Sequence, residues 1–313
     1  YHHKHLPAPD YSGLPFDKYV SFLDVVNPMH RMWTDYRWNK LTISHGCYWK
    51  QCSFCDVSLD YIGNYQNTTA DDLVDKIEKI VKTTGIAGFH FVDEAAPPKM
   101  LRALSNKLIE RNVRITWWTN IRFEKTFDFE LCQLMATSGC IAVTGGLEVA
   151  SDRLLAKMKK GVDIAQVTRV TNYFSKNNIM VHAYLMYGFP TQTEQETIDS
   201  LEVVRQLFKS NCIQSAFWHL FTTTIHSPIG KNPQEFGITI TGPTFEGFAQ
   251  NDLYHEDPQG ADHHKYTTGL NNALNNYLNK VGFDKALEHW FDFPIPKTSH
   301  SKNLIDNYLA VSC

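Results

Sequence analysis

Hydrophobic residues follow a regular alternation between about residue 40 and residue 220. Short apolar runs typical of buried strands are each followed by a stretch whose apolar residues recur at helical spacing. The expected strands are 41–44, 88–93, 113–119, 140–148, 179–187 and 213–220. The expected helices are 70–82, 98–111, 128–137, 151–159, 164–175 and 193–209. These strand–helix units predict a parallel sheet, either curled into a barrel or open and doubly wound.

Residues at the helix ends support these boundaries. Thr69 precedes the helix expected over 70–82 as an N-cap, and Gly85 lies just beyond its end. The helix expected over 193–209 opens with Thr193-Glu194-Gln195-Glu196, which is a capping box. The helical periods are therefore bounded by residues that satisfy the free backbone groups of helix ends.

The polarity of alternate strand residues favours the barrel. In the strand expected over 179–187, His182 and Tyr184 alternate with apolar residues that suit the helix-facing side. The same reasoning places Thr144, Glu148 and Asn120 inside. A closed eight-stranded barrel fills its interior with branched apolar side chains. A polar lumen instead predicts an α/β fold with a partial (β/α)6 barrel that is open to a ligand.

The flanking segments have a different character. Residues 1–38 contain several prolines and aromatic residues and are expected to form an irregular N-terminal arm packed on the domain, residues 39–225 the barrel, and residues 226–313 a C-terminal extension covering its opening. Within the extension, residues 231–260 are rich in proline and glycine and predict an irregular lid or a small β extension. The rest predicts helices at 262–281, 284–291 and 302–309.

Composition excludes several classes of protein. The net charge of −3 gives no electrostatic basis for binding nucleic acid or an anionic membrane. No apolar run approaches the roughly 20 residues that span a bilayer, and no signal peptide is visible. The seven cysteines are odd in number, and three are clustered. This usage indicates a metal site in a reducing compartment, and hence a cytoplasmic protein, rather than a secreted disulfide framework.

The cysteine cluster lies directly after the first expected strand. Cys47, Cys52 and Cys55 have Cys-x4-Cys-x2-Cys spacing, and thiolates this close together favour iron–sulfur, zinc or copper(I). A four-iron cluster normally takes four cysteines, so three would leave one iron open to another ligand. Two alternatives stay open: a zinc site that recruits His45 as its fourth ligand, and cysteines that bind no metal and pack as small hydrophobic residues.

This segment resembles the cluster-binding loop of the radical S-adenosylmethionine (radical SAM) superfamily. The family pattern is Cys-x3-Cys-x2-Cys with an aromatic residue before the last cysteine; Phe54 has that place, and the first gap is one residue longer here. The resemblance implies a [4Fe-4S] cluster whose open iron binds S-adenosylmethionine and cleaves it reductively to a 5′-deoxyadenosyl radical. It further implies an electron donor such as flavodoxin or ferredoxin, and a small-molecule or peptide substrate.

The same resemblance implies residues that hold S-adenosylmethionine. Asp93 and Glu94 end the second strand, where the family often has a Gly-Gly-Glu-like stretch for the methionine amino group, although the glycines are absent here. Glu148 lies in a stretch similar to the family's Gly-x-Glu-Ser segment, whose glutamate reaches the ribose or the amino group. Asn120 and Arg122 are further candidates for cofactor or substrate contact. For Asp93 and Glu94, helix capping is the alternative.

Two later segments complete the implied site. Arg153 and Lys160 are candidate partners of the methionine carboxylate, with a solvated helix charge as the alternative for each. The turn containing Gly188, Phe189 and Pro190 resembles the family's adenine-contacting turn. Glycine permits close approach of the backbone, and proline fixes the turn.

No catalytic residue can be assigned from the sequence, although three lumen residues are candidates. They are His182, Tyr184 and His219. For His219 a satisfied structural histidine is the alternative, because nothing near it in sequence supplies a base or a ligand partner.

The segment 6–15 and the turn after the fifth strand look most like the branch whose members carry an upstream cobalamin-binding domain. The chain starts at Tyr1 rather than methionine. If it is part of a longer protein, cobalamin-assisted methyl transfer or rearrangement is an alternative; if it is complete, cobalamin would bind another subunit or be absent. The non-enzyme alternative is a zinc-stapled binding module.

Overall fold

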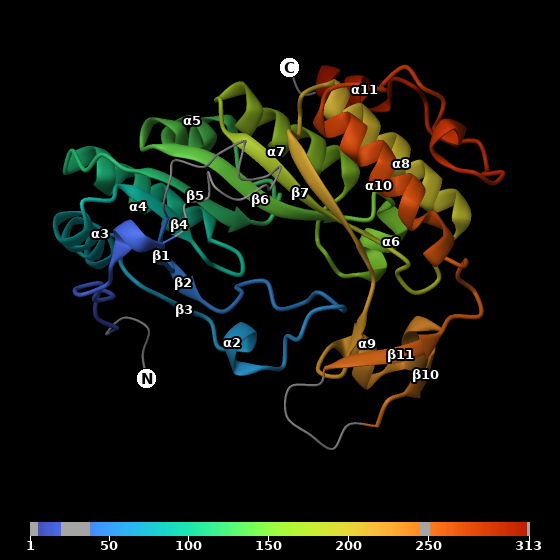
Figure 1. Ribbon diagram of the computed structural model, residues 1–313, viewed down its shortest axis with the longest axis horizontal. Helices are drawn as coiled ribbons and strands as arrows, with labels where there is room; N and C mark the ends of the chain where they lie inside the picture. Colours follow the sequence, from blue (N-terminus) through green and yellow to red (C-terminus); the bar gives the residue numbers. More distant parts are fainter. Residues whose placement is uncertain (1–5, 20–37, 245–250, 312–313) are drawn as a thin grey trace. The chain divides into compact units, whose positions relative to one another are not determined.

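The structure, a computed structural model, describes residues 6–19, 38–244 and 251–311 (Figure 1). The chain divides into two compact units. The first comprises residues 1–48, 64–145 and 173–182, and the second comprises residues 49–63, 146–172 and 183–313. Most of the predicted N-terminal arm, including its aromatic residues Tyr1, Phe22, Trp33 and Tyr36, lies outside the described residues.

The main sheet has six strands in the order β1-β4-β5-β6-β7-β8. The register is parallel between β1 and β4, between β4 and β5, and between β5 and β6. This arrangement confirms the predicted α/β fold with a partial barrel. The strands are β1 (Asn39–Leu41), β4 (Gly88–Phe91), β5 (Thr116–Ile121), β6 (Cys140–Glu148), β7 (Met180–Tyr187) and β8 (Ser215–Leu220).

The first strand differs from the prediction because the chain leaves the sheet early. β1 ends at Leu41, and β2 (Ser44–His45) pairs antiparallel with β3 (Gln66–Asn67). The backbone N–H groups of Ile43 and Ser44 donate to the carboxylate of Asp93 rather than to a neighbouring strand. The segment that precedes the cysteines is therefore bonded to a side chain at the end of β4.

Three helices of the first unit pack side by side (Figure 1). They are α3 (Ala70–Thr84), α4 (Pro98–Glu110) and α5 (Phe129–Thr137). The predicted ends of α3 are confirmed: the Thr69 side chain accepts from the backbone N–H of Asp72, and Gly85 adopts a left-handed conformation with φ of 69°. Proline at the first position of α4 leaves no backbone N–H unsatisfied there.

In the second unit, α10 (Thr267–Leu278) and α11 (Leu304–Ala310) pack on α8 (Glu194–Lys209) (Figure 1). The capping box predicted for α8 is present, with Thr193 and Glu196 bonded reciprocally. The segment predicted as a helix over 284–291 instead forms a short 3-10 helix, η6 (Leu287–Trp290). Further helical elements along the chain are η2 (Phe16–Lys18), α2 (Asp60–Gly63), α6 (Asp152–Lys157), α7 (Ile164–Lys176) and η5 (His264–Tyr266).

The segment 231–260, predicted as an irregular lid or a small β extension, supplies two strands of a three-stranded antiparallel sheet in the order β10-β11-β9. Its strands are β9 (Thr223–Thr224), β10 (Thr239–Gly242) and β11 (Asp252–Glu256), and α9 (Pro228–Lys231) and η4 (Pro233–Phe236) lie between β9 and β10 in sequence. A buried cluster containing Phe189, Phe221 and Phe236 anchors this extension, and Phe54 from the cysteine segment packs against it.

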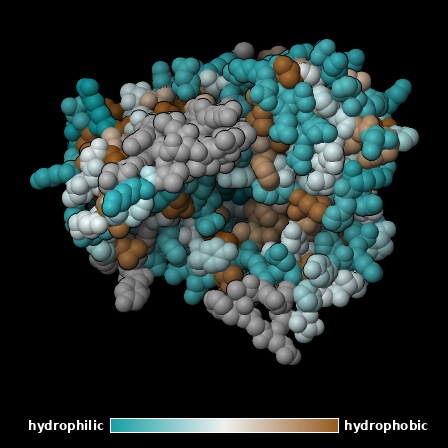
Figure 2. Space-filling view, in the orientation of Figure 1, coloured by the Kyte–Doolittle hydropathy of each residue, from teal (hydrophilic) through white to brown (hydrophobic). Residues whose placement is uncertain are grey.

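The visible face of the molecule is mainly hydrophilic, and its hydrophobic side chains lie in small separate groups (Figure 2). Among the residues described, no helix has the length and apolar character needed to cross a bilayer.

Candidate functional site

At the end of β4 the carboxylate of Asp93 is held by the chain itself. It accepts from the backbone N–H groups of Ile43 and Ser44 at 2.9 and 2.7 Å, and from the Ser44 hydroxyl at 2.9 Å. Asp93 is only 1% exposed. Burial raises the pKa of this carboxyl to about 6, although the hydrogen bonds from Ile43 and Ser44 lower it. Asp93 thus shapes the entry to the cysteine segment, whereas Glu94 is exposed.

Asn120 joins the ends of three strands of the first unit. Its side-chain amide donates to the Asp93 carbonyl at 2.8 Å, and its side-chain oxygen accepts from the hydroxyl of Thr144. Arg122 is buried, and its Nε lies 3.9 Å from the Glu124 carboxylate. Burial and the charge of Glu124 raise the pKa of Tyr48, the neighbour of Cys47. Both polar candidates on this side therefore have structural partners.

The three cysteines of the motif are half-buried, and none forms a disulfide with another cysteine of the described chain. Cys47 belongs to the first unit, and Cys52 and Cys55 belong to the second. Within the described ranges, no group of three histidine, cysteine or acidic side chains is close enough to hold a metal ion.

The part of the segment that follows Cys47 rests on a turn after α6. The Trp49 indole N–H donates to the Lys159 carbonyl at 2.8 Å, and the Ser53 N–H donates to the Met158 carbonyl at 2.9 Å. Gly161 has φ of 73°, and a Cβ on it would lie 2.3 Å from the Trp49 ring. Position 161 therefore requires glycine. The turn contacts the Trp49 ring and accepts hydrogen bonds from the cysteine segment, which it supports.

Glu148 and Lys160 form an ion pair beside that support. Lys160 Nζ lies 2.5 Å from Glu148 Oε1 and 5.5 Å from the centre of the Phe54 ring. Both charged side chains are about nine-tenths buried. Glu148 has φ of 63°, a conformation that is costly outside glycine and recurs at functional sites. A Cβ on Gly146 would lie 1.8 Å from Glu148 Oε1, so the glycine makes room for the carboxylate.

The Arg153 side chain is bonded to the turn that follows β7. Its guanidinium pairs with Glu196 at 2.6 Å and donates to the Thr191 carbonyl at 2.9 Å. The Thr191 N–H donates to the Asp257 carboxylate at 2.6 Å, with φ of 70° at Thr191. Gly188 also has positive φ, at 80°, and a Cβ there would lie 2.9 Å from Leu220 Cδ1.

The rest of that turn is buried. Phe189 belongs to the buried cluster of the extension, and Pro190 is buried beside it. The predicted adenine-contacting turn is therefore fixed by Arg153, whereas Lys160 faces Glu148 in a separate pair.

The catalytic candidates fall into two environments. His182 is fully buried, whereas Tyr184 and His219 are exposed, with ring centres 6.3 Å apart. Burial lowers the pKa of His219, and the charge of Glu148 opposes that change. Tyr184 and His219 thus form an exposed pair of rings in the second unit, whereas His182 lies in the interior.

Sequence reasoning missed the role of Asp56, which follows Cys55 directly. It is 8% exposed and accepts from the Thr224 hydroxyl at 2.5 Å and from the Asn251 amide at 3.0 Å. The feature of the sequence that could have indicated this role is a carboxylate directly after the last cysteine of the motif. Its partners lie about 170 and 195 residues later in the chain, so the sequence alone does not reveal them.

A family model described as the radical SAM superfamily matches residues 41–204, just over half of the 313 residues. The matched range begins in β1, includes all three motif cysteines and ends within α8.

Curated relatives are similar over most of the chain at low identity. An uncharacterized methyltransferase of Pyrococcus horikoshii is 26% identical over 64% of this chain and 41% of its own length. The anaerobic magnesium-protoporphyrin IX monomethyl ester cyclase of Rubrivivax gelatinosus is 26% identical over 77% of this chain and 40% of its own length. The alignments thus span less than half of these relatives.

Among solved structures, the radical S-adenosylmethionine methyltransferase TsrM from Kitasatospora setae, with cobalamin and a [4Fe-4S] cluster bound, has a TM-score of 0.59. It is 17% identical, and the alignment covers 88% of this chain and 61% of that one. At this identity the likeness concerns the fold.

Proposed function

The chain belongs to the radical SAM superfamily, and from this premise we propose that it binds a [4Fe-4S] cluster through Cys47, Cys52 and Cys55 and cleaves S-adenosylmethionine reductively. The observation that carries the proposal is the cysteine segment held on the turn at residues 157–161, beside the buried Glu148–Lys160 pair. The substrate is a small molecule or a peptide, and a flavodoxin or ferredoxin supplies the electron.

The donor set fits such a cluster. Three half-buried thiol side chains can each ligate one iron, and the fourth iron keeps an open position. Phe54, between Cys52 and Cys55 in sequence, is fixed by the apolar cluster of the extension and by Lys160. When bound, the cluster supplies one electron to S-adenosylmethionine. A site of this kind needs a reducing compartment, which supports a cytoplasmic location.

Residues around Glu148 then bind the rest of S-adenosylmethionine. The Glu148 carboxylate accepts from the ribose hydroxyls or the amino group, and Lys160 lies beside it to balance the charge of the methionine carboxylate. In the first unit, Glu94 is the exposed acid at the end of β4 and stays a candidate for the amino group by its place in the sequence alone. The turn at Gly188 presents its backbone to the adenine, and Arg153 fixes that turn from behind.

Methyl transfer with cobalamin is the second candidate. Relatives and structural neighbours named as methyltransferases favour it, including one solved with cobalamin bound. The alignments cover 41% of the Pyrococcus horikoshii methyltransferase and 61% of the TsrM chain, so this candidate function requires a cobalamin-binding segment to be sought outside the aligned residues. Reductive cleavage yields 5′-deoxyadenosine, whereas simple methyl transfer yields S-adenosylhomocysteine, so product analysis separates the two activities.

The test is formation of 5′-deoxyadenosine by the anaerobically reconstituted protein with a chemical reductant. Replacing Cys47, Cys52 or Cys55 by alanine should abolish the product because each thiolate holds one iron. Cys132→Ala, at a buried cysteine outside the motif, is the matched control and should retain cleavage. Cleavage that persists in any of the three motif variants contradicts the ligand assignment.

A further inference from the structure

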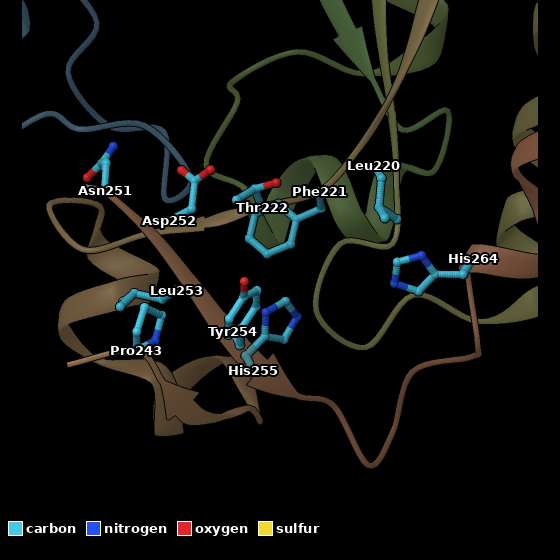
Figure 3. A pocket seen from close by; sticks show the side chains of 10 residues that line it. All are labelled: Leu220, Phe221, Thr222, Pro243, Asn251, Asp252, Leu253, Tyr254, His255 and His264. Atoms are coloured by element: carbon cyan, nitrogen blue, oxygen red, sulfur yellow. The ribbon is translucent and has the colours of Figure 1, made fainter. Parts of the chain in front are cut away.

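A pocket of about 650 Å³ lies in the second unit where β8 ends, and the small sheet forms its wall (Figure 3). Its volume is in the range of small-molecule sites. Its lining comes from the end of β8 and the segment that follows it, from the residue after β10, from β11 with the residue before it, and from η5. The residues are Leu220, Phe221, Thr222, Pro243, Asn251, Asp252, Leu253, Tyr254, His255 and His264.

Aromatic rings dominate the interior of this pocket. In Figure 3 the ring of Phe221 lies between Asp252 on one side and the rings of Tyr254 and His255 on the other. Phe221 and His255 are in edge contact with centres 5.7 Å apart, and the Thr223 hydroxyl lies 3.1 Å from His255 Nδ1. Tyr254 is 72% exposed, so most of its ring is open to contact with a ligand. The pocket thus offers both fixed and uncovered ring faces.

The charge of the lining is negative. Among the described residues that line the pocket there is no lysine or arginine, and Asp252 contributes a carboxylate. Burial lowers the pKa of His255, which keeps its imidazole neutral near pH 7. Phosphorylated or polycarboxylate ligands are disfavoured here, because nothing in the lining neutralises them. Aromatic faces beside a carboxylate instead suit a ring that carries an ammonium group.

The pocket is linked to the cysteine segment by direct contacts. Asp56, the neighbour of Cys55, accepts from the side chain of Asn251 in the pocket wall. Phe221, which lines the pocket, belongs to the apolar cluster against which Phe54 packs. The Ile229 N–H donates to the Ser53 carbonyl at 3.1 Å, which fixes α9 to the same segment. A ligand in this pocket is therefore held by the elements that position two of the motif cysteines.

We propose that this pocket binds the substrate and that the substrate is a planar aromatic small molecule bearing an amine, with Tyr254 and Phe221 contacting the ring and Asp252 contacting the amine. The assignment as a substrate pocket rests on the proposed radical SAM activity. Contacts between the pocket and the aromatic ring define the class of substrate. Residues of the extension that follows β8 make these contacts and so determine which substrate is accepted.

The experiment measures binding of two probes, tryptamine and indole-3-acetate, to the full chain by calorimetry. They share an indole ring and differ in charge, so we expect tryptamine to bind several-fold more tightly. Tyr254→Ala should weaken tryptamine binding by about three- to tenfold through loss of one ring contact. Asp252→Asn should bring the two probes to within about twofold of each other. Both positions are exposed, so the variants should fold.

Tyr61→Ala is the matched control, since Tyr61 is a half-exposed tyrosine of α2 outside the pocket, and it should leave both affinities unchanged. Equal tryptamine affinity in wild type and Tyr254→Ala overturns the pocket assignment, and a charge preference that survives Asp252→Asn overturns the amine assignment. Cleavage of S-adenosylmethionine is measured on the same reconstituted preparation. Intact cleavage without indole binding contradicts this inference alone, whereas indole binding without cleavage contradicts the proposed function alone.

Discussion

The carboxylates that end β4 and β6 occupy similar places along their strands but have different partners. Asp93 accepts from two backbone N–H groups and a hydroxyl of the segment at residues 43–44, in an ordinary backbone conformation. Glu148 is paired with the Lys160 ammonium, and its backbone is in the left-handed region. Both side chains are buried.

The difference indicates which carboxylate a ligand can use. Backbone donors around Asp93 cannot move away without opening the chain, so that carboxylate is fixed by the fold. Glu148 is instead held by a single buried side chain, Lys160, so a ligand can compete for its carboxylate without breaking backbone hydrogen bonds. A strained acid held by a side chain fits a binding role, whereas an acid held by the backbone fits a structural one.

The largest expected effect concerns the buried ion pair. Lys160→Met leaves Glu148 buried without its cation and should lower the free energy of unfolding by about 4 kcal/mol, measured by chemical denaturation without S-adenosylmethionine. The double variant Glu148→Gln/Lys160→Met should recover much of that loss. Lys159→Met, at the exposed neighbour, is the control and should change stability by less than about 0.5 kcal/mol. Additive losses in the double variant would contradict the pairing.

Asp93→Ala should lower the free energy of unfolding by about 3 kcal/mol, because three buried donors lose their acceptor. Glu94→Gln, at the adjacent exposed acid, should change stability by less than about 0.5 kcal/mol. Denaturation of the two variants under the same conditions checks the structural role. Equal losses of stability in Asp93→Ala and Glu94→Gln would contradict the structural role of the Asp93 carboxylate.

The raised pKa of Asp93 predicts a pH dependence. Its pKa is about 6 in the folded state and near 3.8 in the unfolded state, so the folded protein binds more protons between these values. Stability contributed by this proton is present below pH 3.8 and is lost as pH rises through 6, a change of roughly 3 kcal/mol. Asp93→Asn does not titrate and is the control for the denaturation series. Parallel pH profiles for wild type and variant would contradict the shift.

The smallest effect concerns Arg153, whose side chain is half-exposed. Arg153→Gln should lower the free energy of unfolding by about 1 kcal/mol, since it removes a multiply bonded but solvated contact with Glu196. Arg102→Gln, which removes a looser exposed pair with Asp128, is the control and should cost less than about 0.5 kcal/mol. If Arg153→Gln has no effect on stability, the arginine does not fix the turn at Thr191.

Local patterns predicted most of the fold. The apolar run at 140–148 matches β6, and the caps at Thr69 and Thr193 mark the starts of α3 and α8, because these signals act within a few residues. The first strand was predicted too late in the chain. The amides of residues 43 and 44 bond to a side chain about 50 residues away, which no local pattern reveals.

The site was predicted in part. The Cys-x4-Cys-x2-Cys spacing and Phe54 before its last cysteine lie within the range that the family model matches, and their role in holding a metal stays a prediction. The support for that segment was not predicted, because the bond from Trp49 to Lys159 joins residues 110 positions apart. Arg153 was interpreted as a ligand for the cofactor, yet it pairs with Glu196, a residue that the sequence identified only as part of a cap.

The most direct test of the account is EPR of the reduced, anaerobically purified protein before and after S-adenosylmethionine is added, together with iron and sulfide analysis. The account predicts about four irons per chain and a signal that changes with the cofactor, because one iron is open to it. A colourless protein containing zinc, or a cluster whose signal ignores S-adenosylmethionine, would contradict the central claim.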